Sequence, residues 1–484
     1  MRGLIFLLLA MLGAGPAHAL PDAPALRAMV ADRMAEAAGP GLLEITAFRT
    51  MGQAPDPAGG ARIAYFSARL RLMRDHQFGG WDGQNLQALA AALGAGPRAI
   101  AGASRDGNRA GDVLRVNGAL RLRQEAGRWV PLAARAAGPA TAFEGQGARA
   151  ERLLAAIGTA LTAGQAASGG ALTPVIEQEL AHAWRNIEAR QARLRQGLPL
   201  AGGAPGSEYA WLAEAIARLP AGAGLAPVTA LGSAGSVENL RLLASGTATL
   251  AISQADIAFR ALTGGAPEWD LPALPGLHAL AALYPEAVHV MVPAASGIHS
   301  LADLHGRVVA VGRPGSGARV TAEAVLHAHG LGPEASPRLP LAPEEMAAAL
   351  AGGRAAAAIL VSLAPSQAVL RLAEAVPLRF LPLDAGAVAR LTAGNLLLRH
   401  AIPSGTYPGQ ADAVPGVATM AALVAAEGPT TAEVTALLTR LFRGPELSSA
   451  AGPAALMIRR EAAASPLPLP FHEGARRFFG MPAE

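Results

Sequence analysis

Two residue types are absent from this chain of 484 residues, cysteine and lysine. Without cysteine there can be no disulfides, thiol nucleophiles, zinc–thiolate sites or lipid anchor on an N-terminal cysteine. Without lysine, all 40 basic side chains are arginines. That excludes the phosphate-binding loop whose lysine contacts the phosphates, and it excludes Schiff-base chemistry. The two absences thus exclude that class of ATPase and two forms of covalent catalysis.

Aromatic residues are scarce, at 4%, and they are not interleaved with the arginines. Although the formal net charge is +4, nucleic acid is therefore not expected as a partner. Apolar residues make up 51% of the chain, which allows a sizeable core. The length suggests about three domains at roughly 150 residues each.

An uninterrupted apolar run near the start of the chain predicts export. Arg2 precedes the run Leu4–Leu12, and Ala17 and Ala19 stand at the two small-residue positions that a signal peptidase reads. The run is far shorter than the roughly 20 residues that span a bilayer. We predict a cleaved signal peptide over residues 1–19 and a mature protein in the periplasm; a membrane anchor is the alternative.

The next two segments differ in their periodicity. Residues 20–145 are predicted to form a small α+β module, because a helical pattern over Ala25–Ala38 is followed by several strand-like runs. Apolar and polar residues alternate over Val113–Asn117, which predicts a sheet with one solvent-facing side. Residues 146–196 carry apolar residues at three- and four-residue spacing and are predicted to form a helical linker.

From Leu198 onward, short apolar runs alternate with helical patterns. Val228–Leu231 leads into a Gly/Ser turn and a helix, and Arg307–Val311 leads into Gly312–Gly317 and a further helix. Strands that alternate with helices predict parallel sheets and an α/β fold. Ligands of such sheets bind beyond the C-terminal ends of the strands.

Four strand-to-helix turns in this part are rich in Gly and Ser. A helix N-terminus carries about half a positive charge and unpaired N–H donors, so such a turn can bind a carboxylate or a phosphate. For any single turn the alternative is ordinary N-capping by its serine. Together the four turns predict a cleft for a small anionic solute.

The order of these motifs resembles the TAXI-type substrate receptors of TRAP transporters, from about Leu198 to Gly480. The matching blocks are Pro205–Ala210, Gly235–Leu243, Ile252–Asp256, Ala281–Glu286, Ser300–Gly306, Pro314–Glu323 and Ile402–Gln410. The resemblance implies a type II periplasmic-binding-protein fold of two α/β lobes over residues 197–484. Lobe 1 would comprise about 197–297 and 390–484, and lobe 2 about 298–389. It also implies capture of small organic acids, glutamate-like compounds among them, for a TRAP-type membrane permease, with no cofactor.

Carried over by position, the resemblance implies a ligand-binding set from both lobes: Gly206, Ser207, Tyr209, Ser233, Ser236, Gln254, Ser316, Gly317 and Arg319. Arg319 can pair with a ligand carboxylate through two hydrogen bonds, or it is a helix-surface arginine. Gln254 contacts the ligand or caps its helix. Tyr209 stacks on the ligand or packs the lobe. Tyr284 and Glu286 are interpreted as hinge-side structure.

The chain departs from the family's pattern at three places. Ala210 stands where a second tyrosine is usual, Gly353–Ala356 lacks the usual aspartate, and Thr249 replaces an acidic residue. These departures predict a shallower site or a different ligand.

A second hypothesis is a sensory or scaffold protein of the envelope that reuses the receptor fold. The extra N-terminal module favours it, since a minimal receptor needs no such module, and a protein partner for that module is then expected. Enzymatic activity is not expected. The chain has no Gly-x-Ser-x-Gly motif and no His-Glu-x-x-His motif, and His327 and His329 diverge around a helix instead of chelating a metal.

Overall fold

The computed structural model describes residues 20–56, 60–78, 84–95, 99–104, 107–132, 159, 197–219, 226–426, 428–443, 447 and 452–482. The predicted signal peptide lies outside these residues, and so does the predicted helical linker apart from residue 159.

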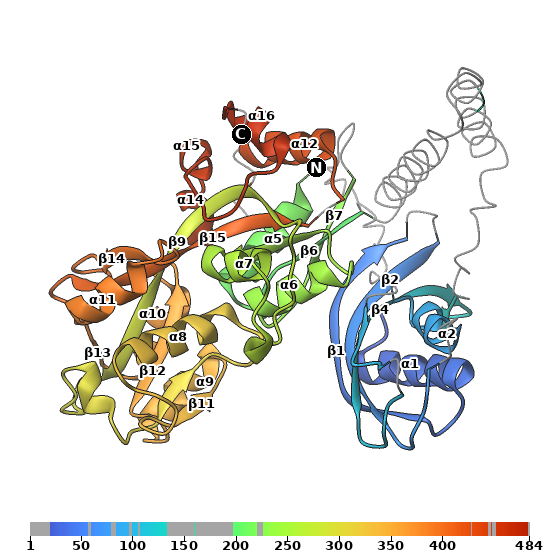
Figure 1. Cartoon of the computed structure of the whole chain (residues 1–484), viewed down its shortest axis with the longest axis horizontal. Coiled ribbons are helices and arrows are strands. Elements are labelled where there is room, and N and C mark those ends of the chain that lie inside the picture. The colour runs from blue at the N-terminus through green and yellow to red at the C-terminus, as the bar shows by residue number, and fades with distance from the viewer. Residues whose placement is uncertain are drawn as a thin grey trace, which may run out of the picture.

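An N-terminal module pairs an antiparallel sheet with two helices, as the periodicity predicted (Figure 1). The helices are α1 (Ala23–Ala38) and α2 (Gln84–Ala92). Asp22 caps α1 by accepting a hydrogen bond from the N–H of Ala25. The strand order is β1-β2-β4-β3, with β5 on β4, and the strands are β1 (Leu43–Pro55), β2 (Ala61–Leu72), β3 (Ile100–Ala101), β4 (Val113–Glu125) and β5 (Arg128–Pro131).

Both faces of the module's sheet are partly covered. On β2, Phe66 and Leu70 pack with the helices in one buried cluster. Ile63 and Tyr65 point to the opposite face and pack against the neighbouring α/β domain. The prediction of one solvent-facing side is therefore wrong at this end of the sheet, because a second domain covers it.

A second, mixed sheet carries the described residues from Leu198 onward. Its order is β11-β10-β12-β9-β15-β8-β6-β7, with β13 on β9 and β14 on β15. β6 is parallel to β7 and β8, and β10 is parallel to β11 and β12, which confirms the α/β fold. These strands are β6 (Leu198–Ala201), β7 (Val228–Leu231), β8 (Leu250–Gln254), β10 (Val309–Val311), β11 (Arg338–Pro340) and β12 (Ala357–Ser362).

We call the half built on β6, β7 and β8 lobe 1, and the half built on β10, β11 and β12 lobe 2. In both halves the first strand lies between the second and the third. The helices that follow these strands are α5 (Glu208–Arg218), α6 (Ser236–Ala244), α7 (Ala255–Leu262), α8 (Gly317–Ala328), α9 (Pro343–Ala351) and α10 (Gln367–Ala375). Other short elements are η1 (Pro267–Trp269), η2 (Leu301–Leu304), β13 (Leu378–Phe380), α11 (Ala385–Thr392) and β14 (Leu398–Ile402). Helices α12 (Thr431–Arg443), α14 (Gly452–Met457), α15 (Arg460–Ala463) and α16 (Glu473–Phe479) end the chain.

Two long strands connect the lobes. β9 (His278–Pro293) pairs with β15 (Val414–Ala425) in its first half and with β12 in its second half, so it runs from lobe 1 into lobe 2. β15 returns to pair with β8 of lobe 1. Figure 1 shows these two strands bridging the green and the orange halves, with the N-terminal module beside lobe 1. Hinge motion between the lobes would therefore act on β9 and β15.

Hydrophobic clusters lie on both sides of each lobe's sheet. In lobe 1, α5 packs with the C-terminal helices α12, α14 and α16 on one side, and α6 and α7 pack on the other. In lobe 2, α8 and α11 cover one side, and α9 and α10 cover the other. Within the described part of the chain, no helix is both long and apolar enough to cross a membrane.

Candidate functional site

The turns that follow β7 and β10 are in direct contact where the two lobes meet. Glu238, in the first turn of α6, donates its backbone N–H to the carbonyl oxygen of Gly315 in lobe 2 at 3.0 Å. A Cβ placed on Gly235 would lie 3.3 Å from the Cα of Ser316. The structure thus brings the N-termini of α6 and α8, from opposite lobes, together.

Gly317 is the closest point of this contact. A Cβ built on it would lie 2.0 Å from Oε1 of Gln254 and 2.7 Å from Oγ of Ser236, both in lobe 1. Its φ lies outside the left-handed region, so close packing and not backbone conformation requires glycine here. Three of the predicted site residues therefore meet at one place.

The serines of the predicted site mostly bond to their own turns. Ser207 caps α5 and Ser316 caps α8 by accepting from backbone N–H groups three residues on, at 3.2 and 3.3 Å. The Ser233 hydroxyl donates to the carbonyl of Gly202 and accepts from the N–H of Gly235. Gly206 is exposed and has a positive φ. Ser207 and Ser316 therefore make the N-capping bond that the sequence allowed as the alternative to ligand contact.

Gln254 does not cap its helix through its side chain. It is the last residue of β8, its side chain is 2% exposed, and its backbone N–H donates to the Ser236 hydroxyl at 3.0 Å. Its side-chain Oε1 has no hydrogen-bond partner among the described residues. A buried amide oxygen without a partner costs free energy, so a bound donor at this position would be stabilising.

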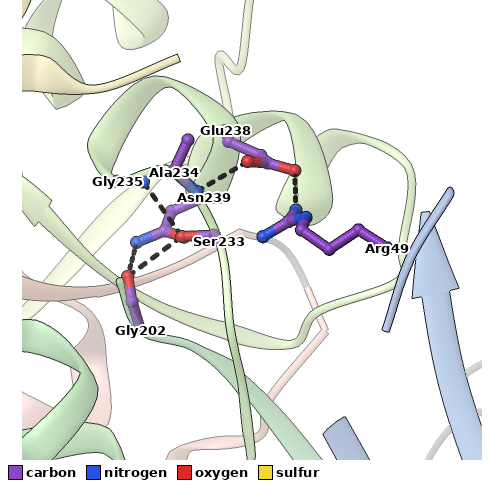
Figure 2. A network of polar contacts seen from close by, with 7 residues as sticks. All are labelled: Arg49, Gly202, Ser233, Ala234, Gly235, Glu238 and Asn239. Carbon is purple, nitrogen blue, oxygen red and sulfur yellow. Dashed lines mark hydrogen bonds and ion pairs between the residues drawn. The ribbon is translucent and has the colours of Figure 1, made fainter. Parts of the chain in front are cut away.

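Glu238 binds the turn before α6 through its side chain (Figure 2). Its carboxylate accepts from the N–H of Ala234 at 2.6 Å and forms an ion pair with Arg49 of β1. Beside it, the Asn239 amide donates to the carbonyl of Gly202 and to that of Ile252, the latter at 2.7 Å. The turn is therefore held by side chains from α6 and by the N-terminal module.

Tyr209 packs in the lobe 1 core and bonds to β9. Its side chain is 7% exposed, and its hydroxyl donates to Oε2 of Glu286 at 2.6 Å. Burial, together with the nearby Glu286 charge, raises the pKa of Tyr209 well above its usual value, so the phenol keeps its proton. Between stacking on a ligand and packing the lobe, the structure shows the packing role.

The half-buried carboxyl of Glu208 and the buried carboxyl of Asp256 both lie near the buried carboxyl of Glu286, the partner of Tyr209. The pKa of Glu286 is raised to about 8, mainly by burial; the bond from Tyr209 lowers it, and the charges of Glu208 and Asp256 contribute to the rise. Burial also raises the pKa of Glu208 and of Asp256, whose Oδ1 accepts from Thr419 at 2.6 Å. Near neutral pH, Glu286 is therefore mostly protonated and can donate a hydrogen bond.

A second contact between the lobes involves Glu208. The hydroxyl of Ser366, at the start of α10, donates to Oε1 of Glu208 at 3.1 Å. The Ser366 N–H donates to the hydroxyl of Tyr407, which lies 2.8 Å from Nε2 of His289 on β9. Burial lowers the pKa of His289 to about 4, so this imidazole is neutral at pH 7. The Tyr407 and His289 groups of this contact are therefore uncharged at pH 7.

Buried polar atoms without partners lie on β9 and on the strands that pair with β9 and β15. Besides Gln254, these include the hydroxyls of Tyr284 on β9 and Ser362 at the end of β12, within the residues that the structure describes. Ala421 of β15 pairs with Gln254 on one side and Tyr284 on the other, so these side chains share one face. A bound group that supplied hydrogen bonds to these atoms would therefore be stabilising.

Arg319 lies in the first turn of α8. Its guanidinium carbon lies 6.0 Å from the ring centroid of Trp269 in lobe 1, at the outer limit of a cation–π contact, and its Nε has no partner among the described residues. Arg319 therefore bridges the lobes at the edge of the α6–α8 contact.

Sequence reasoning did not single out Glu208, Ser366 or Tyr407. Glu208 and Tyr407 stand inside matched motifs, but their partners are distant in sequence: Ser366 is 158 residues from Glu208 and 41 from Tyr407, and His289 is 118 from Tyr407. Within the described residues, no group of three or more His, Asp or Glu side chains is arranged to hold a metal.

Several solved structures resemble part of the chain. The alkanesulfonate-binding protein SsuA from Xanthomonas axonopodis pv. citri, bound to MOPS, is 17% identical with a TM-score of 0.31, over 59% of this chain and 83% of that one. The periplasmic aliphatic sulphonate binding protein SsuA from Escherichia coli is 18% identical with a TM-score of 0.31, over 53% and 79%. MatC from Rhodopseudomonas palustris, with bound malate, is 14% identical with a TM-score of 0.35, over 52% and 86%. At these TM-scores the likenesses carry no information on the solute of this chain.

The family model gives a firmer assignment. The model of the NMT1-like family matches residues 200–480, which cover both lobes and more than half of the chain. The chain therefore belongs to the NMT1-like family.

Proposed function

We propose that this protein is an extracytoplasmic solute-binding receptor that captures a small solute between its two lobes and passes it to a membrane transporter. The observation that carries the proposal is the meeting of the α6 and α8 N-termini at Ser236 and Gly317, beside the unpartnered Oε1 of Gln254. Two lobes joined by two strands can close on a solute beside this contact if β9 and β15 bend.

The finer proposal is a small organic acid or a glutamate-like carboxylate, delivered to TRAP-type permease subunits. Support comes from the resemblance to TAXI-type receptors and from the two helix N-termini, which favour an anionic group. Ser236, Gln254 and Gly317 would contact the solute directly. Ser207, Ser233, Ser316 and Gly206 would support the turns, and Arg319 would attract the carboxylate from the edge. The apolar run at the start of the chain supports export to the periplasm.

The test is a thermal-shift screen of organic acids and amino acids against the mature protein from Leu20, followed by calorimetry of each hit. A ligand that binds only the folded form raises the free energy of unfolding by mass action, by about 2.7 kcal/mol at a ligand concentration of a hundred times Kd. The melting temperature rises accordingly. We expect one chemical class of carboxylate to shift the transition. Binding to a protein partner, with no response to any solute, would overturn the receptor proposal.

The second candidate function is a sensory or scaffold role in the envelope. One observation favours it: the N-terminal module shares a hydrophobic cluster with lobe 1 through Met51 and Tyr65, so its orientation is fixed relative to the lobes. This candidate predicts a stable complex with an envelope protein that forms equally with and without solute. Cross-linking of the full chain in membranes, with and without the screened acids, separates the two functions.

A further inference from the structure

The edge of β1 reaches the turn of lobe 1 that meets lobe 2. The N–H of Gly232 donates to the carbonyl of Met51 at 2.6 Å, and Arg49 pairs with Glu238 in α6 (Figure 2). Gly52 permits this approach, because a Cβ on it would lie 2.7 Å from the carbonyl oxygen of Ala230. A β-bulge at Thr50 and Gly52 re-aims the strand at this point.

An apolar interface supports these polar contacts. Met51 and Tyr65 of the module are 4% and 6% exposed, and they pack in one cluster with Leu231 and Val237 of lobe 1. A further ion pair joins Arg115 of β4 to Asp270, which also pairs with Arg241 of α6. The module is therefore docked on lobe 1 by a buried surface as well as by the turn contact.

Glu238 connects the module to lobe 2. Its backbone N–H bonds to Gly315 of lobe 2, while its carboxylate holds the Ala234 N–H and pairs with Arg49. The Glu238 side chain is 17% exposed, so its charge is only partly screened by water. An unpaired carboxylate at this place would repel an anion at the N-terminus of α6, and Arg49 neutralises it.

We propose that the N-terminal module completes the solute site, with Arg49 as a positioning residue. Arg49 and Met51 hold the turn Gly232–Gly235 and Glu238 in the conformation that receives lobe 2. Arg49 acts on the solute through Glu238, not by touching it. The role in solute binding rests on the proposed function, whereas the positioning of the turn by Arg49 is testable without any solute.

The experiment measures the distance between the lobes in the full-length protein. Because the chain has no cysteine, two exposed positions, Glu214 of lobe 1 and Ala375 of lobe 2, can be changed to cysteine and spin-labelled uniquely. In Arg49→Met we expect the short-distance population to fall about threefold to tenfold, the loss expected when one hydrogen bond of ordinary strength is removed from a partly exposed pair. Arg49→Lys, which keeps the charge, should restore most of it.

Two further variants make the test specific. Gly52→Val should lower the short-distance population as much as Arg49→Met, since it pushes β1 off the turn. Arg115→Ala removes a module contact that is made to Asp270 and to no residue of the turn Gly232–Gly235, and should leave the distribution unchanged. Equal distributions in wild type, Arg49→Met and Gly52→Val would overturn the inference, and so would an equal loss in Arg115→Ala.

A solute arm separates this inference from the proposed function. Calorimetry with succinate, malate and glutamate as probes is run on wild type, Arg49→Met, Glu238→Gln and the double variant. If Arg49 offsets the Glu238 charge, Arg49→Met weakens binding several-fold and Glu238→Gln in the same chain recovers it. Additive losses would overturn the electrostatic part. If no probe binds wild type but the lobe distances respond as expected, the solute proposal fails and the positioning of the turn stands.

Discussion

Substitution of Gly317 by alanine tests whether the lobes close where the structure places their contact. The added Cβ would lie 2.0 Å from Oε1 of Gln254, and 2.7 and 2.8 Å from Oγ and Cβ of Ser236. All three atoms belong to lobe 1, whereas Gly317 belongs to lobe 2. The backbone at Gly317 is compatible with alanine, so the new methyl group acts on the contact between lobes and not on the fold of α8.

The size of the effect follows from the cost of overpacking. One extra methyl in a filled interface costs typically about 1–3 kcal/mol. Opening the lobes relieves that cost, so the closed form should lose roughly 5- to 150-fold against the open form. A solute that binds the closed form then binds weaker by the same factor. The melting temperature without solute should change little, because each lobe keeps its own core.

Spin-label distances between Glu214→Cys and Ala375→Cys measure the closed population, and calorimetry measures affinity for whichever acid the screen identifies. Gly332→Ala is the matched control: its φ is also outside the left-handed region, and no described atom lies within 4 Å of the new Cβ. If Gly317→Ala and Gly332→Ala have the same lobe distances and affinities, the contact in the structure is not the closed state that binds solute.

Three other predictions concern charge and packing. The pKa of Glu286 is raised from 4.5 to about 8, so between these pH values the folded state keeps a proton that the unfolded state releases. The contribution of this proton to the free energy of unfolding is complete below about pH 4.5 and is lost as pH rises towards 8. Glu286→Gln should remove this slope, worth up to roughly 5 kcal/mol, in urea titrations across that range, and an unchanged slope would contradict the assignment. Arg319→Glu should abolish binding of a carboxylate while leaving folding intact, and unchanged affinity in calorimetry would remove Arg319 from the site. Phe66→Ala should destabilise the module core by about 3–5 kcal/mol in urea unfolding, since Phe66 is fully buried; a loss below 1 kcal/mol would show that the core reorganises.

Local patterns in the sequence predicted the architecture of the lobes well. Short apolar runs followed by Gly/Ser turns predict β-α units, and the strands β6 and β10 begin such units as expected. The caps at Ser207 and Ser316 also follow from local chemistry, because a serine before a helix satisfies a nearby N–H. These features depend on residues within a few positions of each other, and a single sequence contains that information.

The sequence could not indicate which distant groups become partners. Arg49 and Glu238 are 189 residues apart, and nothing in their neighbourhoods marks one for the other. The covered face of the module's sheet left a weak signal, since Ile63 to Phe66 are apolar on both faces of β2. The adjacent strand gave the opposite indication, because the residues of Val113–Asn117 alternate between the core and a more exposed face. That alternation predicted a solvent-facing side for the whole sheet.

The buried carboxyls bear directly on the kind of solute that can bind. Glu208, Glu286 and Asp256 would together oppose an anion if all three were charged, since like charges in a poorly solvated site repel strongly. Burial removes much of this conflict by keeping Glu286 protonated near neutral pH, where its carboxyl is a hydrogen-bond donor. An anionic solute at the α6 and α8 N-termini is therefore compatible with the acid cluster only below the pKa of Glu286. Affinity for a carboxylate should accordingly weaken as pH rises through about 8, whereas an uncharged solute should bind equally on both sides of it.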